Sequence, residues 1–155
     1  MQQIQPTPTP SIRQTFLADH CRLEALMDRV LAASMGSSRQ ELADLWDEFD
    51  AQLLAHMEAE EAHLIPVLRQ TSERDARALM QEHKLIRERL AELDVAVDLH
   101  AVRFTMVKQF IDELQAHAAH EDALLYASSD AGFAPDTRRS VLNALLSLVR
   151  PTGYG

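Results

Sequence analysis

The chain has 155 residues, which is the size of one compact domain and leaves no room for a second large one. Only 4 glycines and 5% aromatic residues disfavour an all-β or loop-rich architecture, so a helical fold is expected. A formal charge of −9, with 15 basic residues scattered along the sequence, disfavours nucleic acid as a partner.

The first ten residues, MQQIQPTPTP, are proline-rich and polar, and we expect residues 1–10 to form a flexible N-terminal arm. They lack the basic and apolar stretches of a secretion signal. No apolar run in the chain approaches the roughly 20 residues that span a bilayer. The sequence therefore predicts a cytoplasmic protein with no membrane partner.

Two helices are predicted in the first half of the chain. The first begins at a capping box formed by Ser11 and Gln14, and it stops at Gly36. The second opens with another capping box at Ser38, where Glu41 follows three residues later. It continues beyond Pro66, which is expected to kink the last turn because proline removes one helical hydrogen bond.

Two more helices follow at short intervals. The third begins after Thr71 and Ser72 and ends near residues 98–101. The inner face of the fourth is predicted to carry Val107, Phe110, Leu114, Leu124 and Ser128. Since short connections make neighbouring helices antiparallel, residues 11–128 are predicted to form an all-α, up-down-up-down four-helix bundle.

Residues 129–155 are expected to form a loop and an extra C-terminal helix. Pro135 fits the first position of this helix, and the pair Arg150 and Pro151 ends it. Its apolar face is predicted to consist of Val141, Leu142, Leu145, Leu146 and Val149. This amphipathic helix either caps the bundle or forms the contact of a homodimer.

Each of the four bundle helices carries metal-ligand side chains within its apolar stripe. These residues are His20 in the first helix, His56 and Glu60 in the second, His83 in the third, and His117 and Glu121 in the fourth. At about 1.5 Å per residue, counting from the turns places them within roughly one helical turn of a common depth. Four histidines and two glutamates are therefore expected to meet in one layer.

Burying these six groups without partners would cost several kcal/mol, and bound cations remove that cost. Cys21 is the only cysteine, which excludes a thiolate cluster and leaves nitrogen and oxygen ligands; it is expected to be a small buried side chain. Six protein ligands overfill one ion, whereas a glutamate can bridge two. Two iron ions are expected, with zinc or manganese as alternatives.

The sequence resembles the hemerythrin superfamily, in its HHE cation-binding branch, over roughly residues 12–128. The resembling segments are DH at 19–20, HMEAEE at 56–61 with IP at 65–66, EHKLIR at 82–87 and HAAHED at 117–122. The resemblance implies an oxo- or hydroxo-bridged pair of irons. Its terminal ligands would be the four histidines His20, His56, His83 and His117, and its bridging carboxylates Glu60 and Glu121.

Two positions bear on the comparison with the oxygen-carrying hemerythrins, and the first departs from them. Arg87 stands where they have a second third-helix histidine, and it either extends toward solvent or pairs with a carboxylate near the metals. Asp122 stands where they have a bridging aspartate, so it competes with Glu121. The ligand set looks more like the iron-centre repair, nitric-oxide-responsive and iron-sensing relatives, although the cysteine-bearing domain common in the repair proteins is not present. Reversible oxygen carriage is therefore disfavoured, and one iron is expected to have an exchangeable position.

Four further residues are candidates for the site or its surroundings. His63 follows Glu60 at i+3 and is a candidate extra or substitute ligand, although the ferritin-like pattern needs a second such pair. Glu24 is expected to be a partly exposed acid that orients a ligand. His100 and His120 are expected at the surface or beside a ligand.

The favoured function is that of a non-heme di-iron binding protein that takes O2, NO or peroxide at an open iron position, for sensing, scavenging or iron storage. One alternative is a di-iron redox enzyme, namely an oxidase or an NO or peroxide reductase. Another is a metal-free or zinc-stabilised helical interaction module. The sequence carries no signature of a substrate pocket or an electron-transfer partner, which favours binding over catalysis.

Overall fold

The computed structural model describes residues 10–36 and 38–149, with side chains up to Ala144. The predicted arm at residues 1–10 therefore lies almost wholly outside the described residues, as do Arg150 and Pro151. The described residues contain helices and no strand, which confirms the all-α prediction. None of these helices is both long and apolar enough to cross a bilayer.

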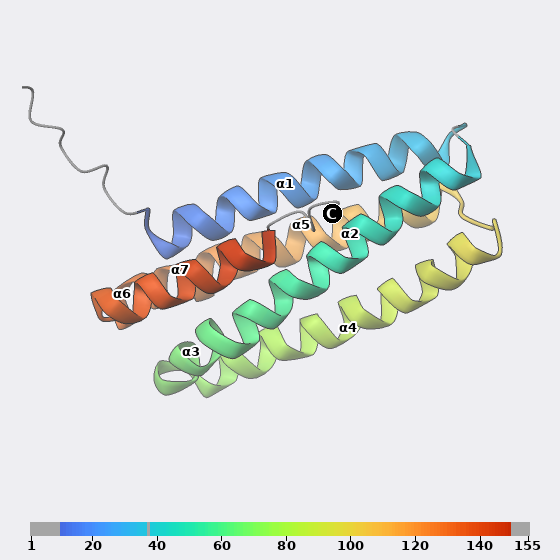
Figure 1. Ribbon diagram of the computed structural model, residues 1–155. Coiled ribbons are helices and arrows are strands. Elements are labelled where there is room, and N and C mark those ends of the chain that lie inside the picture. The colour runs from blue at the N-terminus through green and yellow to red at the C-terminus, as the bar shows by residue number, and fades with distance from the viewer. Residues whose placement is uncertain (1–9, 37, 150–155) are drawn as a thin grey trace, which may run out of the picture.

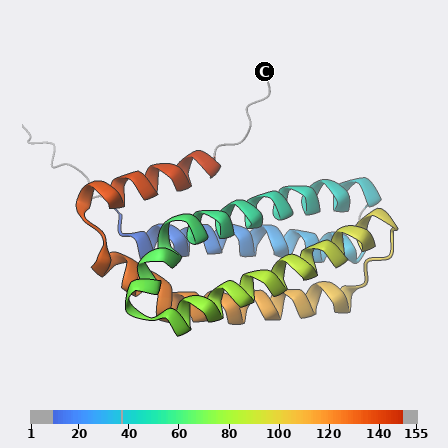
Figure 2. The same cartoon turned by 90° about the horizontal axis from the view of Figure 1, so that it is seen from below.

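Four antiparallel rods make up the bundle (Figure 1). In chain order, the rods are α1 (Ile12–Ser34), then α2 (Arg39–Ala59) with η1 (Glu60–Leu64) and α3 (Ile65–Thr71), then α4 (Glu73–Asp98), and finally α5 (Phe104–Glu121) with η2 (Asp122–Tyr126) and α6 (Ala127–Gly132). The rod of α1 contacts those of α2 and α5, and α4 contacts the same two rods from the opposite side. The up-down-up-down prediction is confirmed (Figures 1 and 2).

Side-chain caps fix where three of the rods begin. The Ser11 hydroxyl accepts a hydrogen bond from the Gln14 backbone N–H at 3.0 Å, and the Gln14 side chain accepts one from Ser11 at 2.9 Å, so the predicted capping box is complete. Ser38 accepts from the Glu41 N–H at 3.1 Å, which is one half of the second predicted box. Ser72 caps α4 in the same way.

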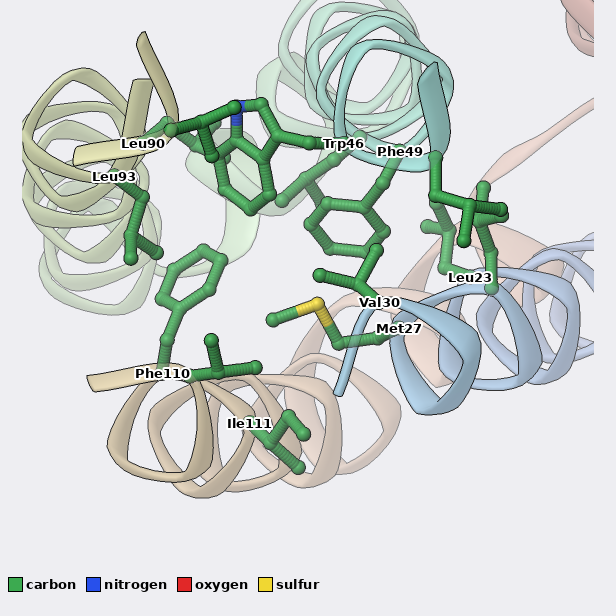
Figure 3. Packing of buried hydrophobic residues seen from close by; sticks show 14 of the residues in the cluster. Leu23, Met27, Val30, Trp46, Phe49, Leu90, Leu93, Phe110 and Ile111 are labelled. Atoms are coloured by element: carbon green, nitrogen blue, oxygen red, sulfur yellow. The ribbon is translucent and has the colours of Figure 1, made fainter. Parts of the chain in front are cut away.

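Two apolar clusters fill the bundle, one toward each end. The larger lies toward the α1–α2 and α4–α5 turns, and its labelled members in Figure 3 are Leu23, Met27, Val30, Trp46, Phe49, Leu90, Leu93, Phe110 and Ile111. The smaller surrounds α3 and includes Ile12, Phe16, Leu79, Leu125 and Tyr126. On α1, His20 lies between Phe16 of one cluster and Leu23 of the other, so a polar layer separates them.

Both rods that contain a glutamate of the predicted site leave α-helical geometry at that glutamate. Glu60 is the first residue of the π-helical turn η1, and Glu121 directly precedes the π-helical turn η2. A π turn holds one more residue than an α turn, and such turns are frequent at functional sites. Pro66 lies just beyond η1, so the irregularity predicted there exists, but it takes the form of a π turn that begins at Glu60.

The π turn η2 changes which residues of the fourth rod face inward. Leu125 and Tyr126 are fully buried, and Ser129 is buried one turn later. Leu124 and Ser128, which the helical spacing predicted on that face, are only partly buried. That prediction was wrong because the extra residue of the π turn rotates everything after it about the helix axis.

The extra C-terminal helix is α7 (Pro135–Val149), and Pro135 is its first residue as predicted. It lies against α2 and α1 (Figure 2), with Val141 and Leu142 buried. The side chains of Leu145, Leu146 and Val149 are outside the described residues. This helix covers one side of the bundle, while its role in a homodimer stays a prediction.

Candidate metal centre

The six predicted ligand residues come together between the two apolar clusters. They form two groups in which potential ligand atoms lie within 4.8 Å of one another: His20, His56, Glu60 and Glu121 in one group, and His83, His117 and Glu121 in the other. Because Glu121 belongs to both groups, the groups are halves of one site. All four rods contribute to it, as the helical spacing indicated.

Glu121 touches three of the histidines. Its Oε1 lies 3.1 Å from Nε2 of His117 and 3.4 Å from Nε2 of His20. Its Oε2 lies 3.3 Å from Nε2 of His83. The carboxylate is 1% exposed and therefore spans both groups inside the protein.

Glu60 spans the site in a similar way from the second rod. One of its oxygens contacts Nε2 of His56, one turn earlier on the same rod, and the other lies 3.8 Å from Nε2 of His83. Both carboxylates thus reach histidines of both groups. This is the arrangement that two bridging carboxylates between neighbouring cations require.

Three of the imidazoles are oriented by carboxylates on their outer nitrogen. Nδ1 of His56 lies 2.5 Å from Asp19, Nδ1 of His83 lies 3.3 Å from Glu61, and Nδ1 of His117 lies 2.9 Å from Glu82. A carboxylate that accepts the Nδ1 proton fixes the ring tautomer and directs the unprotonated Nε2 at the site. These contacts are typical of metal-binding histidines.

The orienting carboxylates are themselves held in place. Arg22 donates to Asp19 at 2.5 Å, and Arg87 donates to Glu61 at 2.7 Å. The outer nitrogens of His56 and His83 are therefore connected through carboxylates to guanidinium groups. Arg87, which replaces a histidine of the oxygen carriers, does pair with a carboxylate beside the site.

Burial and neighbouring charges move the pKa values of the histidines in opposite directions. Burial, together with the nearby His56, lowers the pKa of His20 to about 4. Burial also opposes a charge on His56, but the carboxylates of Glu60 and Asp19 outweigh it and raise the pKa of His56 to about 9. Without a cation, the His56 ring therefore carries a second proton and a positive charge, and it lies between the two carboxylates.

Several inner atoms have no hydrogen-bond partner in the described structure. They are both carboxylate oxygens of Glu60 and Nε2 of His117; all are buried, and they meet other site residues in ion-pair contacts that lack hydrogen-bond geometry. Leaving such atoms without hydrogen bonds is costly, and a cation satisfies them all at once. The set of imidazole nitrogens and carboxylate oxygens therefore fits a pair of iron ions, and also suits zinc or manganese.

A family model described as the hemerythrin HHE cation binding domain matches residues 11–127. The chain belongs to the hemerythrin HHE cation-binding family. The matched range covers the four-rod bundle up to the first residue of α6, and it includes all six site residues of this hemerythrin domain. No curated protein and no solved structure matched the chain at a significant level. The family match and the buried His/Glu cluster together assign cation binding to this domain.

The other candidates of the sequence analysis lie outside both ligand groups. Asp122 binds Arg13 at 2.7 Å on the surface, so Glu121 rather than Asp122 faces the hemerythrin site. His63 is partly buried and belongs to neither group. His120 contacts Glu82 at 2.6 Å and thus lies beside the partner of a ligand, as expected.

Three more candidates lie at the surface. His100 is exposed near the end of α4. Glu24 accepts a hydrogen bond from Gln115 at 3.2 Å rather than from a histidine. Cys21 is exposed, so the expectation of a small buried side chain was wrong; position 21 lies on the outer face of α1, next to the inward-facing His20.

Sequence reasoning missed the orienting carboxylates and one aromatic residue. Asp19, Glu61 and Glu82 are each adjacent in sequence to a residue of the site, and this adjacency was a usable signal. The Tyr126 hydroxyl lies 2.8 Å from Nε2 of His20. Tyr126 comes five residues after Glu121, which places it on the inner face only because η2 is a π turn.

Proposed function

We propose that the protein is a non-heme di-iron protein that binds O2, NO or peroxide at one iron, for sensing, scavenging or iron storage. The observation that carries this proposal is that Glu60 and Glu121 each contact histidines of both groups. A single ion does not need two spanning carboxylates, whereas a pair of ions does.

In this proposal each residue has a defined part. His20 and His56 would bind one iron, His83 and His117 the other, and the two glutamates would hold both. Bound iron would supply redox activity and an exchangeable coordination position. The chain's own residues orient the ligating nitrogens, shield the centre from solvent and, through His56, hold a proton until metal displaces it.

A di-iron redox enzyme is the second candidate, and one observation favours it. A cavity of about 90 Å³ reaches His20, His117 and Glu121 from the seam between α1 and α5. No sequence motif indicated such a pocket. Steady consumption of O2, NO or peroxide by the iron-loaded protein with a reductant would favour the enzyme, and stoichiometric binding alone would favour the sensor or store.

We also propose that the protein works in the cytoplasm. Its lone cysteine is exposed, which suits a reducing compartment. In the cytoplasm the protein would take up its iron as the ferrous ion.

The test is the metal content and absorption spectrum of freshly purified protein, first without and then with oxygen. We expect about two irons per chain and a near-ultraviolet band from the bridged ferric pair. Glu121→Ala and His56→Ala should each lose most of the iron and the band. Asp122→Ala is the matched control, since it removes the neighbouring carboxylate that pairs with Arg13, and it should keep both. Unchanged iron and spectrum in Glu121→Ala and His56→Ala would overturn the proposal.

A further inference from the structure

The cavity beside the metal centre is longer than a diatomic ligand needs. Starting at the site residues, it extends along the bundle to Met27 on α1, Phe49 on α2 and Ile111 on α5. Each of these lies six or seven residues from a site histidine on its own helix, so the cavity runs for about 10 Å. All three belong to the apolar cluster of Figure 3.

Between its two ends the cavity offers only hydrocarbon and thioether groups. Leu53 and Met57 of α2 and Leu114 of α5 form this part, together with Leu23 of α1 and Ala118 of α5. The polar atoms that line it are confined to the inner end, at the site, and to the outer rim. A molecule that fills this space must therefore have an apolar body, and any polar group it carries must face the metals.

The outer rim is acidic. It consists of Glu24, Asp28 and Gln115, all exposed, and Gln115 donates to Glu24 across the opening, which links α5 to α1. Among the described residues that line the cavity, none is a lysine or an arginine. An acidic opening in a chain of net charge −9 disfavours anions, and the apolar interior disfavours any ion.

The volume limits the size of the occupant. At about 90 Å³ the cavity exceeds the roughly 10–15 Å³ that one water needs and falls short of the roughly 150 Å³ of a known benzene-binding cavity. The iron ions would take up part of the inner end. A body of about four to six non-hydrogen atoms fits between these limits.

We infer that this cavity binds a small neutral organic molecule, with a branched-alkyl body against Leu53, Met57 and Leu114 and one oxygen-bearing group directed at the metal centre. This goes beyond the proposed binding of O2, NO or peroxide. It rests on the proposed function only for the direction of the oxygen, because the apolar walls and the acidic rim are independent of the metal.

The test compares three branched-alkyl probes of five or six non-hydrogen atoms with the iron-loaded protein: tert-butanol, tert-butylammonium and isobutyrate. Ligand-detected NMR titration should show saturable binding of tert-butanol, with both charged probes at least tenfold weaker. Isobutyrate binding as tightly as tert-butanol would overturn the neutral-ligand inference, as would no saturable binding of any probe.

Substitutions in the cavity wall test whether tert-butanol binds in the cavity. Leu114→Trp should fill the cavity and weaken tert-butanol binding at least fivefold, and Ala118→Met provides a milder filling variant should the first fail to fold. Leu85→Trp is the matched control, because Leu85 is 50% exposed on α4 and does not line the cavity. Unchanged affinity in a folded filling variant would overturn the inference.

Iron content measured on the same samples separates this inference from the proposed function. If the wild-type protein lacks iron but still binds tert-butanol, and the filling variant does not, the di-iron proposal fails and the cavity inference stands. If all samples carry two irons and tert-butanol affinity is the same in the filling and control variants, the cavity inference alone fails.

Discussion

The hydroxyl of Tyr126 lies 2.8 Å from Nε2 of His20, the nitrogen that faces the metal centre. Tyr126 is fully buried, and its pKa is raised well above the ordinary value, first by burial and then by the nearby carboxylates of Glu60 and Asp19. The phenol therefore keeps its proton, and it acts as a hydrogen-bond donor beside the site rather than as an anionic ligand.

Tyr126→Phe should keep two irons per chain and raise iron affinity by about twofold to tenfold, since iron binding no longer has to break the hydrogen bond from the phenol to Nε2 of His20. A competition titration with a chelator measures the affinity, and the ferric absorption band should shift. Ser128→Ala is the control, because it removes a hydroxyl of the same rod that bonds only to the Leu124 carbonyl. A visible phenolate-to-iron band in the wild type that vanishes in Tyr126→Phe would show that Tyr126 ligates instead.

The fold and the inward-facing residues of the site could be predicted because helical spacing fixes which side chains share a face. His56 and Glu60, four residues apart, had to project together, and the apolar residues around them showed that this face is inside. His117 and Glu121 have the same spacing, so the second and the fourth helix were each predicted to contribute one histidine and one glutamate. The convergence of four histidines followed from periodicity and turn lengths alone.

The π turns could not be predicted in the same way. Pro66 hints at an irregularity after Glu60, but no residue of η2 carries such a signal. The inward position of Tyr126 depends on that turn, so it was missed. The cavity was missed for a different reason: it depends on how side chains from three helices pack, which the sequence of any one helix does not reveal.

Glu61→Gln should weaken iron binding by about tenfold to a hundredfold, although Glu61 is not in either ligand group. Glu61 accepts from Nδ1 of His83 and from Arg87, so the amide would lose the charge that holds this ring and its tautomer. Chelator competition again gives the affinity. Glu58→Gln, an exposed acid on the same rod, is the matched control and should leave the affinity unchanged. Equal affinities in the two variants would contradict an orienting role for Glu61.

Metal loading should release about one proton per chain at neutral pH, and this proton comes from His56. The pKa of His56 is raised to about 9 in the metal-free protein, so the ring is charged at pH 7 and must lose its proton to bind iron. His20 does not contribute above about pH 5, because its pKa is lowered to about 4 and the ring is already neutral.

The apparent affinity for metal should therefore rise about tenfold per pH unit from pH 7 toward pH 9 and then level off. Calorimetric titration in buffers of different ionisation enthalpy counts the protons, and anaerobic zinc titration gives the same count without oxidation. Asp19→Asn should reduce the release, because loss of the partner carboxylate lowers the pKa of His56. A metal affinity that does not change across this range would show that His56 is already neutral before metal binds.

Gly132→Ala should destabilise the protein by about 1–3 kcal/mol, because a Cβ at this position would lie 2.7 Å from Cγ1 of Val67. The direction is informative, since alanine in place of a helical glycine ordinarily stabilises by roughly 0.5–1 kcal/mol. Gly132 ends α6 and Val67 lies in α3, so this contact joins the two rods just beyond their π turns. Denaturant unfolding of the metal-free protein measures the change.

The double variant Gly132→Ala with Val67→Ala should recover stability relative to Val67→Ala alone, because the shorter side chain makes room for the new methyl group. A Gly132→Ala variant as stable as the wild type would mean that α3 and α6 separate easily, and that their contact does not hold this end of the metal centre together.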